Sequence, residues 1–194
     1  YLMKLVFATN NQNKVNEIKS LLGEGIEIVS LKDIGCNEEL PETQETLEGN
    51  ALQKARYVAD NYNVNCFADD TGLEIESLNG APGVYSARYA GMECKAEDNM
   101  TKVLAELVSK ESRVAKFRTI VALILNGEEH SFEGKIDGSI TRSKSGSDGF
   151  GYDPIFQPNG FDITFSEMSM AEKNAISHRG KAVAKLVAFL KGCS

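Results

Sequence analysis

The sequence predicts an α/β protein built on a mixed β-sheet. In the first half of its 194 residues, apolar stripes at helical spacing alternate with short apolar runs of strand length. In the middle, two long strand-like segments meet at Asn126-Gly127, a strong short-range signal for a β-hairpin. Alternating helices and strands together with a long hairpin favour a mixed sheet over a uniform βαβ array.

The first half of the chain divides into strands, helices and one acidic loop. Strands are predicted at residues 4–9, 26–30, 66–70 and 73–75, the last two separated by Thr71-Gly72. One predicted helix follows Asn13 and ends at Gly23, and a second covers Leu47–Tyr62, each with an apolar face. Residues 33–46, with four glutamates around Pro41, are predicted to be a loop.

The second half begins with the turn-forming sequence Gly-Ala-Pro-Gly at residues 80–83, and a helix is predicted at 96–109. The hairpin strands follow at Val114–Leu125 and Glu128–Ile140, and His130 is expected to be a surface strand residue without a catalytic role. After a glycine-rich stretch, Ser169 and Glu172 fit a capping box, and a C-terminal helix should end at Gly192. With no internal repeat or linker, residues 1–194 are predicted to form one domain.

Composition excludes several classes of protein. Hydrophobic residues make up 42% and charged residues 25%, which is typical of globular domains, and the formal net charge is −7. An acidic chain is a poor binder of nucleic-acid polymers or anionic membranes, so neither partner is expected. No apolar run is long enough to span a bilayer and no secretory signal is recognised, so a cytoplasmic protein with four reduced cysteines is expected.

The first candidate site is the turn between the first strand and the first helix. It is made of Thr9, Asn10, Asn11, Gln12, Asn13 and Lys14. Such a turn can aim backbone N–H groups and the positive helix end at a phosphate, and Lys14 adds a charge. The alternative is ordinary capping of a surface helix by asparagine.

The second candidate is the acidic pair Asp69-Asp70 at a predicted strand end. Adjacent carboxylates repel each other unless a cation or hydrogen-bond donors compensate, and such oxygen ligands suit Mg²⁺. The alternative is a pair of turn-forming aspartates before Thr71-Gly72. Glu42 could supply another ligand, although a loop glutamate is more often simply solvated.

Two further candidates lie near the C-terminus. In the glycine-rich stretch, Phe150 offers a flat ring on which a nucleobase could stack, or the ring could fill the core. Beyond it, Lys173 and the pair His178-Arg179 could grip a phosphate or a carbonyl, or form a solvated basic helix start. Taken together, the four candidates describe a nucleoside triphosphate site.

Six ordered blocks carry a family resemblance from residue 4 to about residue 190. They are FATNNQNK, LPETQETLEGNALQKA, FADDTGLEI, GAPGVYSARYAG, GFGYDPIF and MAEKNAISHRGKA. With these blocks the chain resembles the inosine/xanthosine triphosphate pyrophosphatases, which remove non-canonical purine nucleotides. Some relatives have glycine where this chain has Asn10, and asparagine tolerates unusual backbone angles better than most residues.

The resemblance implies a fold, an activity and a set of residues. The fold has two lobes around a long curved mixed sheet, with the active-site cleft between the lobes, and it is commonly a homodimer. The activity is Mg²⁺-dependent cleavage of ITP, dITP or XTP between the α and β phosphates, releasing pyrophosphate. By position, the resemblance assigns the metal to Glu42 and Asp70, and catalysis to Asp70 with help from Asp69. The residues that it assigns to substrate contacts are 9–14, Lys54, Thr71, Arg88, Phe150, Gly151, Tyr152, Asp153, Lys173, His178 and Arg179.

The hypothesis is that water attacks the α phosphorus while the lysines hold the triphosphate in line. Donors around His178-Arg179 would favour the 6-keto oxygen of inosine and xanthosine over the amino group of adenine. Two alternatives remain: a pyrophosphatase of similar fold acting on pyrimidine or modified nucleotides, and a nucleotide-binding sensor without turnover.

Overall fold

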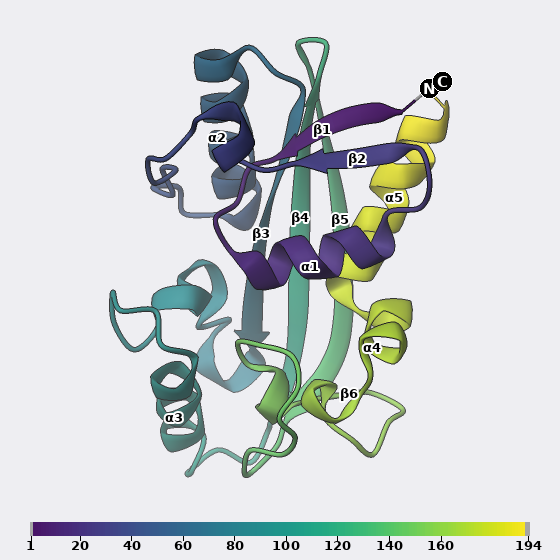
Figure 1. Cartoon of the computed structure of the whole chain (residues 1–194). Helices are drawn as coiled ribbons and strands as arrows, with labels where there is room; N and C mark the ends of the chain where they lie inside the picture. The colour runs from purple at the N-terminus through teal and green to yellow at the C-terminus, as the bar shows by residue number, and fades with distance from the viewer. Residues whose placement is uncertain (1, 193–194) are drawn as a thin grey trace. The chain divides into compact units, whose positions relative to one another are not determined.

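The computed structural model describes residues 2–192, and within them six strands form one sheet (Figure 1). The strands are β1 (Met3–Phe7), β2 (Ile26–Val29), β3 (Cys66–Ile75), β4 (Val114–Leu125), β5 (Glu128–Ile140) and β6 (Phe156–Pro158). The α-helices are α1 (Gln12–Leu21), α2 (Leu47–Tyr62), α3 (Ala96–Glu106), α4 (Met170–Ile176) and α5 (His178–Gly192). Short 3₁₀ helices are η1 (Lys32–Ile34), η2 (Glu76–Leu78), η3 (Gly83–Arg88), η4 (Asp153–Ile155) and η5 (Phe165–Glu167).

The sheet is mixed, as the sequence predicts, and its strand order is β2-β1-β3-β4-β5-β6. β1 pairs in parallel with both β2 and β3. β5 pairs antiparallel with β6. Asn126 and Gly127 both have positive φ, which a two-residue hairpin turn of type I′ requires. The α/β class and the hairpin are therefore confirmed.

The chain divides into two compact units whose boundaries fall inside β3, β4, β5 and the first turn of α5. Unit 1 comprises Tyr1–Asp70, Thr119–Gly134 and Arg179–Ser194, and unit 2 comprises Thr71–Arg118 and Lys135–His178. The strands β3, β4 and β5 each contribute residues to both units. Asp69 and Asp70 end the first segment of unit 1, and Thr71 begins unit 2.

The core of unit 1 is layered around β1 and the first part of β3. Leu5 and Phe7 of β1 share a buried cluster with Ile18 of α1 and the apolar face of α5, and Figure 1 shows the two helices next to each other. Side chains alternate across a strand, so Cys66 and Phe67 point to opposite faces. Cys66 packs on α2, where its thiol donates to the Ala55 carbonyl, so α2 covers the face opposite to α1 and α5.

The core of unit 2 is rich in aromatic rings. Phe117 of β4 packs between Phe156 and Phe165, with ring centroids 4.5 and 6.0 Å away. Leu73 and Ile75, from the second part of β3, and Val103 of α3 belong to the same buried cluster. This core supports the turn at residues 149–153 that carries Phe150.

The structure corrects the prediction of two short strands separated at Thr71-Gly72, because β3 is one continuous strand of 10 residues. A β-branched threonine suits a strand, and the run is buried almost throughout, so the turn signal of Gly72 is overridden by packing. The turn-forming interpretation of Asp69-Asp70 is therefore wrong. The parallel pairing of β1 with β3 reaches only Phe67, so both aspartates lie just beyond the paired segment.

Three cysteines in the described part of the chain are free thiols. Cys36 and Cys66 are buried, and Cys94 is exposed. Burial raises the pKa of the Cys66 thiol to about 12. Cys193 lies outside the described residues. Among residues 2–192, no helix has both the length and the apolar character needed to cross a bilayer.

Candidate active site

The turn after β1 is organised by its own side chains. The Thr9 hydroxyl accepts from the Asn11 N–H at 3.1 Å. Asn11 is the N-cap of α1, and its side-chain oxygen accepts from the N–H groups of Asn13 and Lys14 at 3.0 and 3.3 Å. The capping interpretation is thus confirmed. The turn residues 10–13 are exposed, so capping by Asn11 is compatible with ligand binding at the same helix end.

Four charged side chains form a buried network in unit 1. The Lys14 ammonium donates to Oδ1 of Asp69 at 2.9 Å, and Arg179 Nε donates to Oδ2 at 3.3 Å. A second guanidinium nitrogen of Arg179 bonds the carboxylate of Glu17, on α1. The side chains of Asp69, Arg179 and Glu17 are 0%, 2% and 6% exposed. Two cations and two carboxylates balance in charge, which is what makes their burial tolerable.

The network fixes the protonation of its members. Burial favours neutral Asp69, but Lys14, Arg179 and Lys54 outweigh it and hold the pKa of this carboxyl well below its usual range. Burial also lowers the pKa of Lys14, opposed by the charge of Asp69 and reinforced by the neighbouring cations Lys54 and Arg179. Because Lys54 and Arg179 repel the charge of Lys14, a bound polyanion would stabilise the charged form of Lys14. This environment suits Lys14 to bind phosphate.

Asp70 has a different environment from its neighbour. Burial raises the pKa of its carboxyl, although the charges of Lys54 and Lys14 work in the opposite direction. The Lys54 ammonium lies 3.9 Å from Oδ1 of Asp70 and donates to Oε1 of Glu42 at 2.5 Å. It also donates to the backbone carbonyl of Asp69 at 2.7 Å, which locks α2 against β3.

The donor set around Lys54 suits a hard divalent cation. In residues 2–192, no cluster of three or more His, Cys, Asp or Glu side chains is placed to hold a metal ion. However, Mg²⁺ usually takes only one or two carboxylates and completes its shell with water and substrate phosphates. The Lys54 ammonium lies 2.5 Å from Oε1 of Glu42 and 3.9 Å from Oδ1 of Asp70, so both carboxylates lie near one cationic group. The two carboxylates are therefore chemically suited to bind a Mg²⁺ ion that a substrate phosphate also binds.

Unit 2 holds a second cluster around the turn at residues 149–153. Oδ2 of Asp153 accepts from the Lys173 ammonium at 2.7 Å and from the Phe150 N–H at 3.0 Å. The same ammonium lies 5.0 Å from the centroid of the Phe150 ring. Gly149 has φ +76°, and a Cβ there would collide with the Asp153 carboxylate. The Asp153 carboxylate thus fixes the backbone of Phe150, and the Lys173 ammonium lies beside the face of the half-buried ring.

His178 and Arg179 do not form a solvated helix start, so that alternative is wrong. Both side chains are buried. The imidazole of His178 stacks on Phe117 with ring centroids 4.6 Å apart, within unit 2. Arg179 belongs to unit 1, where its guanidinium lies between Asp69 and Glu17. The two neighbours in sequence therefore serve different clusters.

Tyr152 and Arg88 complete the predicted residues of unit 2. The Tyr152 ring is buried, and its hydroxyl donates to the backbone carbonyl of Ser86 at 2.6 Å. Arg88, at the end of η3, is half-buried and stacks on the exposed ring of Tyr85. Thr71 is half-buried at the middle of β3.

The predicted residues thus fall into two groups. Unit 1 brings together Lys14, Glu42, Lys54, Asp69, Asp70 and Arg179. Unit 2 brings together Phe150, Asp153 and Lys173. Sequence reasoning missed Glu17, whose spacing from Lys14 is that of an ordinary surface ion pair on a helix, so only the fold reveals its burial.

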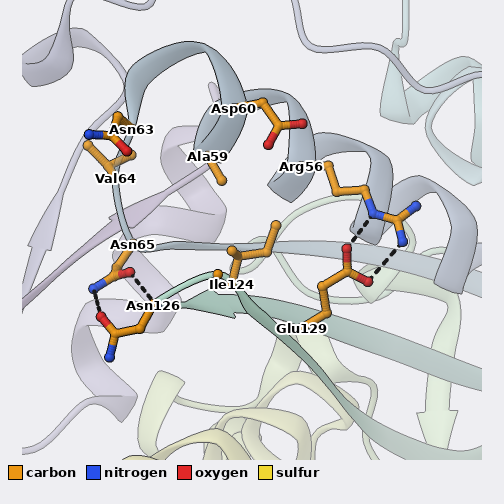
Figure 2. Close-up of a pocket in the computed structure, with 10 residues that line it drawn as sticks. Arg56, Ala59, Asp60, Asn63, Val64, Asn65, Ile124, Asn126 and Glu129 are labelled. Atoms are coloured by element: carbon orange, nitrogen blue, oxygen red, sulfur yellow. Dashed lines mark hydrogen bonds and ion pairs between the residues drawn. The ribbon is translucent and has the colours of Figure 1, made fainter.

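A separate pocket of about 530 Å³ lies in unit 1 between the end of α2 and the β4–β5 turn (Figure 2). Arg56 forms a forked ion pair with Glu129 on one wall, and Asn65 bonds Asn126 at the other. None of the predicted site residues lines this pocket. The predicted site residues therefore lie outside this pocket, in two charged clusters, one within unit 1 and one within unit 2.

Comparison with protein-family models decides the family. The model of the Ham1 family matches residues 5–189. The chain belongs to the Ham1 family. The resemblance to purine triphosphate pyrophosphatases is confirmed, because relatives in Flavobacterium psychrophilum and Porphyromonas gingivalis are named dITP/XTP pyrophosphatases. They are 56% and 54% identical, over 97% and 96% of this chain and 100% and 97% of their own lengths.

Solved structures of Ham1 proteins have the same fold. The Staphylococcus aureus Ham1 protein matches with a TM-score of 0.90 at 38% identity, over 98% of this chain and all of that chain. A HAM1 protein from Coxiella burnetii matches equally well, with a TM-score of 0.90 at 36% identity, over 98% of this chain and all of that chain. The mixed sheet with flanking helices is thus a shared Ham1 architecture.

Proposed function

We propose that this chain is a dITP/XTP pyrophosphatase that hydrolyses dITP, ITP and XTP to the nucleoside monophosphate and pyrophosphate. The observation that carries the proposal is the contrast between two adjacent aspartates. Asp69 is bonded to two cations, whereas Asp70 lies beside Lys54 with its pKa raised. The names of the relatives support this substrate class.

The triphosphate would bind at the unit 1 cluster. The α1 N-terminus supplies backbone N–H groups, and Lys14 and Lys54 supply two positive charges. Each lysine is held by a carboxylate, so both ammonium groups are fixed before the substrate arrives. Fixed charges cost little reorganisation during phosphoryl transfer, where positioning and electrostatics provide most of the catalysis.

Glu42 and Asp70 would hold Mg²⁺ together with the substrate phosphates. When bound, the ion would polarise the phosphoryl oxygens and offset charge on the pyrophosphate. Lys54, which contacts both carboxylates, would orient them and remain available to the triphosphate.

Asp70 would be the general base. Its carboxylate takes a proton from water, the water oxygen bonds to the α phosphorus, and the bond from that phosphorus to the α–β bridging oxygen breaks. The bridging oxygen leaves on pyrophosphate. Asp70 suits this role better than Asp69, whose two carboxylate oxygens are already bonded to Lys14 and Arg179.

The purine would bind at the unit 2 cluster, with its ring on Phe150. Hydrogen-bond donors there, near Lys173 and His178, would meet the 6-keto oxygen of inosine or xanthosine. Adenine presents an amino group instead, which would leave those buried donors unpaired and so disfavour ATP. A homodimer, a cleft between lobes and a cytoplasmic location stay predictions.

The test is pyrophosphate release from ITP, XTP, GTP and ATP, each with and without Mg²⁺. We expect rapid, Mg²⁺-dependent release from ITP and XTP and slow release from ATP. Orthophosphate as the product would show that the β–γ bond is cut and would overturn the mechanism. Hydrolysis of dUTP or dTTP in preference to ITP would favour the pyrimidine alternative, and tight ITP binding without product would favour a sensor.

A further inference from the structure

Within unit 2, the backbone around Arg88 is held by side-chain hydrogen bonds from Tyr152 and Asn99. The Ser86 carbonyl accepts from the Tyr152 hydroxyl at 2.6 Å. The Ala87 carbonyl accepts from the Asn99 side-chain amide at 2.9 Å, and the Ala90 N–H donates to the Asn99 side-chain oxygen at 2.7 Å. Each bond comes from a side chain distant in sequence, so the segment is fixed from outside itself.

Asn99 is the more informative of the two anchoring residues. It lies on α3, is 3% exposed, and uses both its oxygen and its nitrogen on the segment at residues 86–90. A buried amide is costly unless its hydrogen bonds are made, so an apolar residue would be the simpler choice for core packing. A buried asparagine at position 99 is explained if its side chain serves to fix the backbone of residues 86–90.

Ser86 ties the same segment to β3. Its hydroxyl accepts from the Leu73 N–H at 2.9 Å and donates to the Gly83 carbonyl at 2.6 Å. The backbone of η3 is therefore anchored to β3, to α3 and to the turn that carries Phe150. By contrast, the Arg88 side chain is half-buried and stacks on the exposed Tyr85 ring, where a ligand could reach it.

We propose that Tyr152 and Asn99 are positioning residues for Arg88, holding its backbone so that the guanidinium meets the nucleotide bound at Phe150. This inference rests on the proposed function and on the assignment of Arg88 to the substrate by resemblance. Tyr152, placed in the base pocket by resemblance, thus acts through η3 instead of touching the base. Because Tyr152 and Phe150 share one turn, the same turn that receives the purine also sets the position of Arg88.

The test is a double-mutant cycle on the KM for ITP. Tyr152→Phe removes only the hydroxyl and keeps the buried ring, so the fold should persist. We expect the KM to rise roughly three- to tenfold, as the loss of one buried hydrogen bond implies, with kcat little changed. Asn99→Ala should raise the KM more than Tyr152→Phe does, because Asn99 makes two of the hydrogen bonds and Tyr152 makes one. Tyr85→Phe, on the same 3₁₀ helix, is the matched control and should keep the wild-type KM because the ring that stacks on Arg88 remains.

The decisive comparison uses Arg88→Ala as background. If Tyr152 and Asn99 act through Arg88, neither substitution should change the KM further once Arg88 is gone. The same fold-change in both backgrounds would overturn the proposal, as would a wild-type KM in both Tyr152→Phe and Asn99→Ala. An inactive wild-type protein would instead refute the proposed function, and the cycle would then be run on the Kd for ITP by calorimetry, with the same criteria. If Asn99→Ala does not fold, Tyr152→Phe alone completes the cycle.

Discussion

Two aspartates that are adjacent in sequence have opposite chemical characters in this protein. Asp69 is fully buried between Lys14 and Arg179, which hold its pKa low and keep it charged. Asp70 is also largely buried, but burial raises its pKa, although the charges of Lys54 and Lys14 work in the opposite direction. The pair thus separates into one carboxylate that organises cations and one that the proposed mechanism uses as the general base.

Replacing Asp70 by Asn should leave the fold intact and remove most turnover. Asn has the same shape but cannot accept the proton, so we expect kcat to fall roughly 10²- to 10⁴-fold. Pyrophosphate release from ITP measures the loss, and circular dichroism checks the fold. Wild-type turnover in Asp70→Asn would remove this residue from the mechanism.

Replacing Arg179 by Met should destabilise the protein instead. The substitution leaves Asp69 and Glu17 buried without the cation that they share, which costs about 3–5 kcal/mol. Urea unfolding measures the free energy. Arg56→Met is the matched control, since its ion pair with Glu129 is exposed and should contribute less than about 1 kcal/mol. Equal losses in the two variants would contradict a structural role for the buried network.

Among the elements, those with a strong local signal were predictable from sequence. The helix Leu47–Tyr62 and both hairpin strands occur with the predicted bounds, because apolar periodicity and Asn126-Gly127 specify them locally. The continuity of β3 was not predictable, since Thr71-Gly72 is a turn signal that only burial on both faces overrides. The three-residue strand β6 depends on pairing with β5 and has no periodicity of its own.

The β4–β5 turn should be sensitive to its glycine. Gly127 has φ +82°, a conformation that strains any residue with a Cβ, so Gly127→Ala should destabilise the protein by about 1 kcal/mol. Thermal unfolding measures the change. Gly23→Ala is the control, because a Cβ there meets nothing within 4 Å. A Gly127→Ala protein as stable as Gly23→Ala would contradict the strained turn.

The acidic loop is fastened to α2 through Glu38, which should make stability depend on pH. Its carboxylate accepts from the hydroxyls of Tyr62 and Tyr57 at 2.7 and 3.1 Å, and the bond from Tyr62 contributes most to lowering the pKa of Glu38 from 4.5 to about 2. The stabilisation is therefore complete above pH 4.5 and is lost as the pH falls towards 2.

Tyr62→Phe should reduce this dependence, because the pKa of Glu38 then returns towards its ordinary value. Urea midpoints between pH 6 and pH 2 measure it, and Tyr57→Phe, which removes a weaker contribution, is the comparison. An unchanged slope in Tyr62→Phe would show that Glu38 does not fasten the loop.

For the molecule as a whole, the net charge does not predict where the positive side chains gather. A formal net charge of −7 predicts no affinity for polyanions, yet Lys14, Lys54 and Arg179 are gathered in unit 1 among carboxylates. The resemblance identified these residues from short motifs. It did not predict that Arg179 would be buried, or that Glu17 would bond it, because burial depends on residues far apart in sequence.

The thiols of this chain provide an intrinsic record of local opening. Cys94, in unit 2, is exposed and should react with a soluble maleimide in the native state, whereas the buried Cys36 and Cys66, both in unit 1, should react only when their surroundings open. Peptide mass spectrometry distinguishes the sites, so the labelling rates of the two buried cysteines measure how often unit 1 opens. If bound substrate tightens unit 1, ITP should slow the labelling of Cys36 and Cys66 without a mutation or an attached dye.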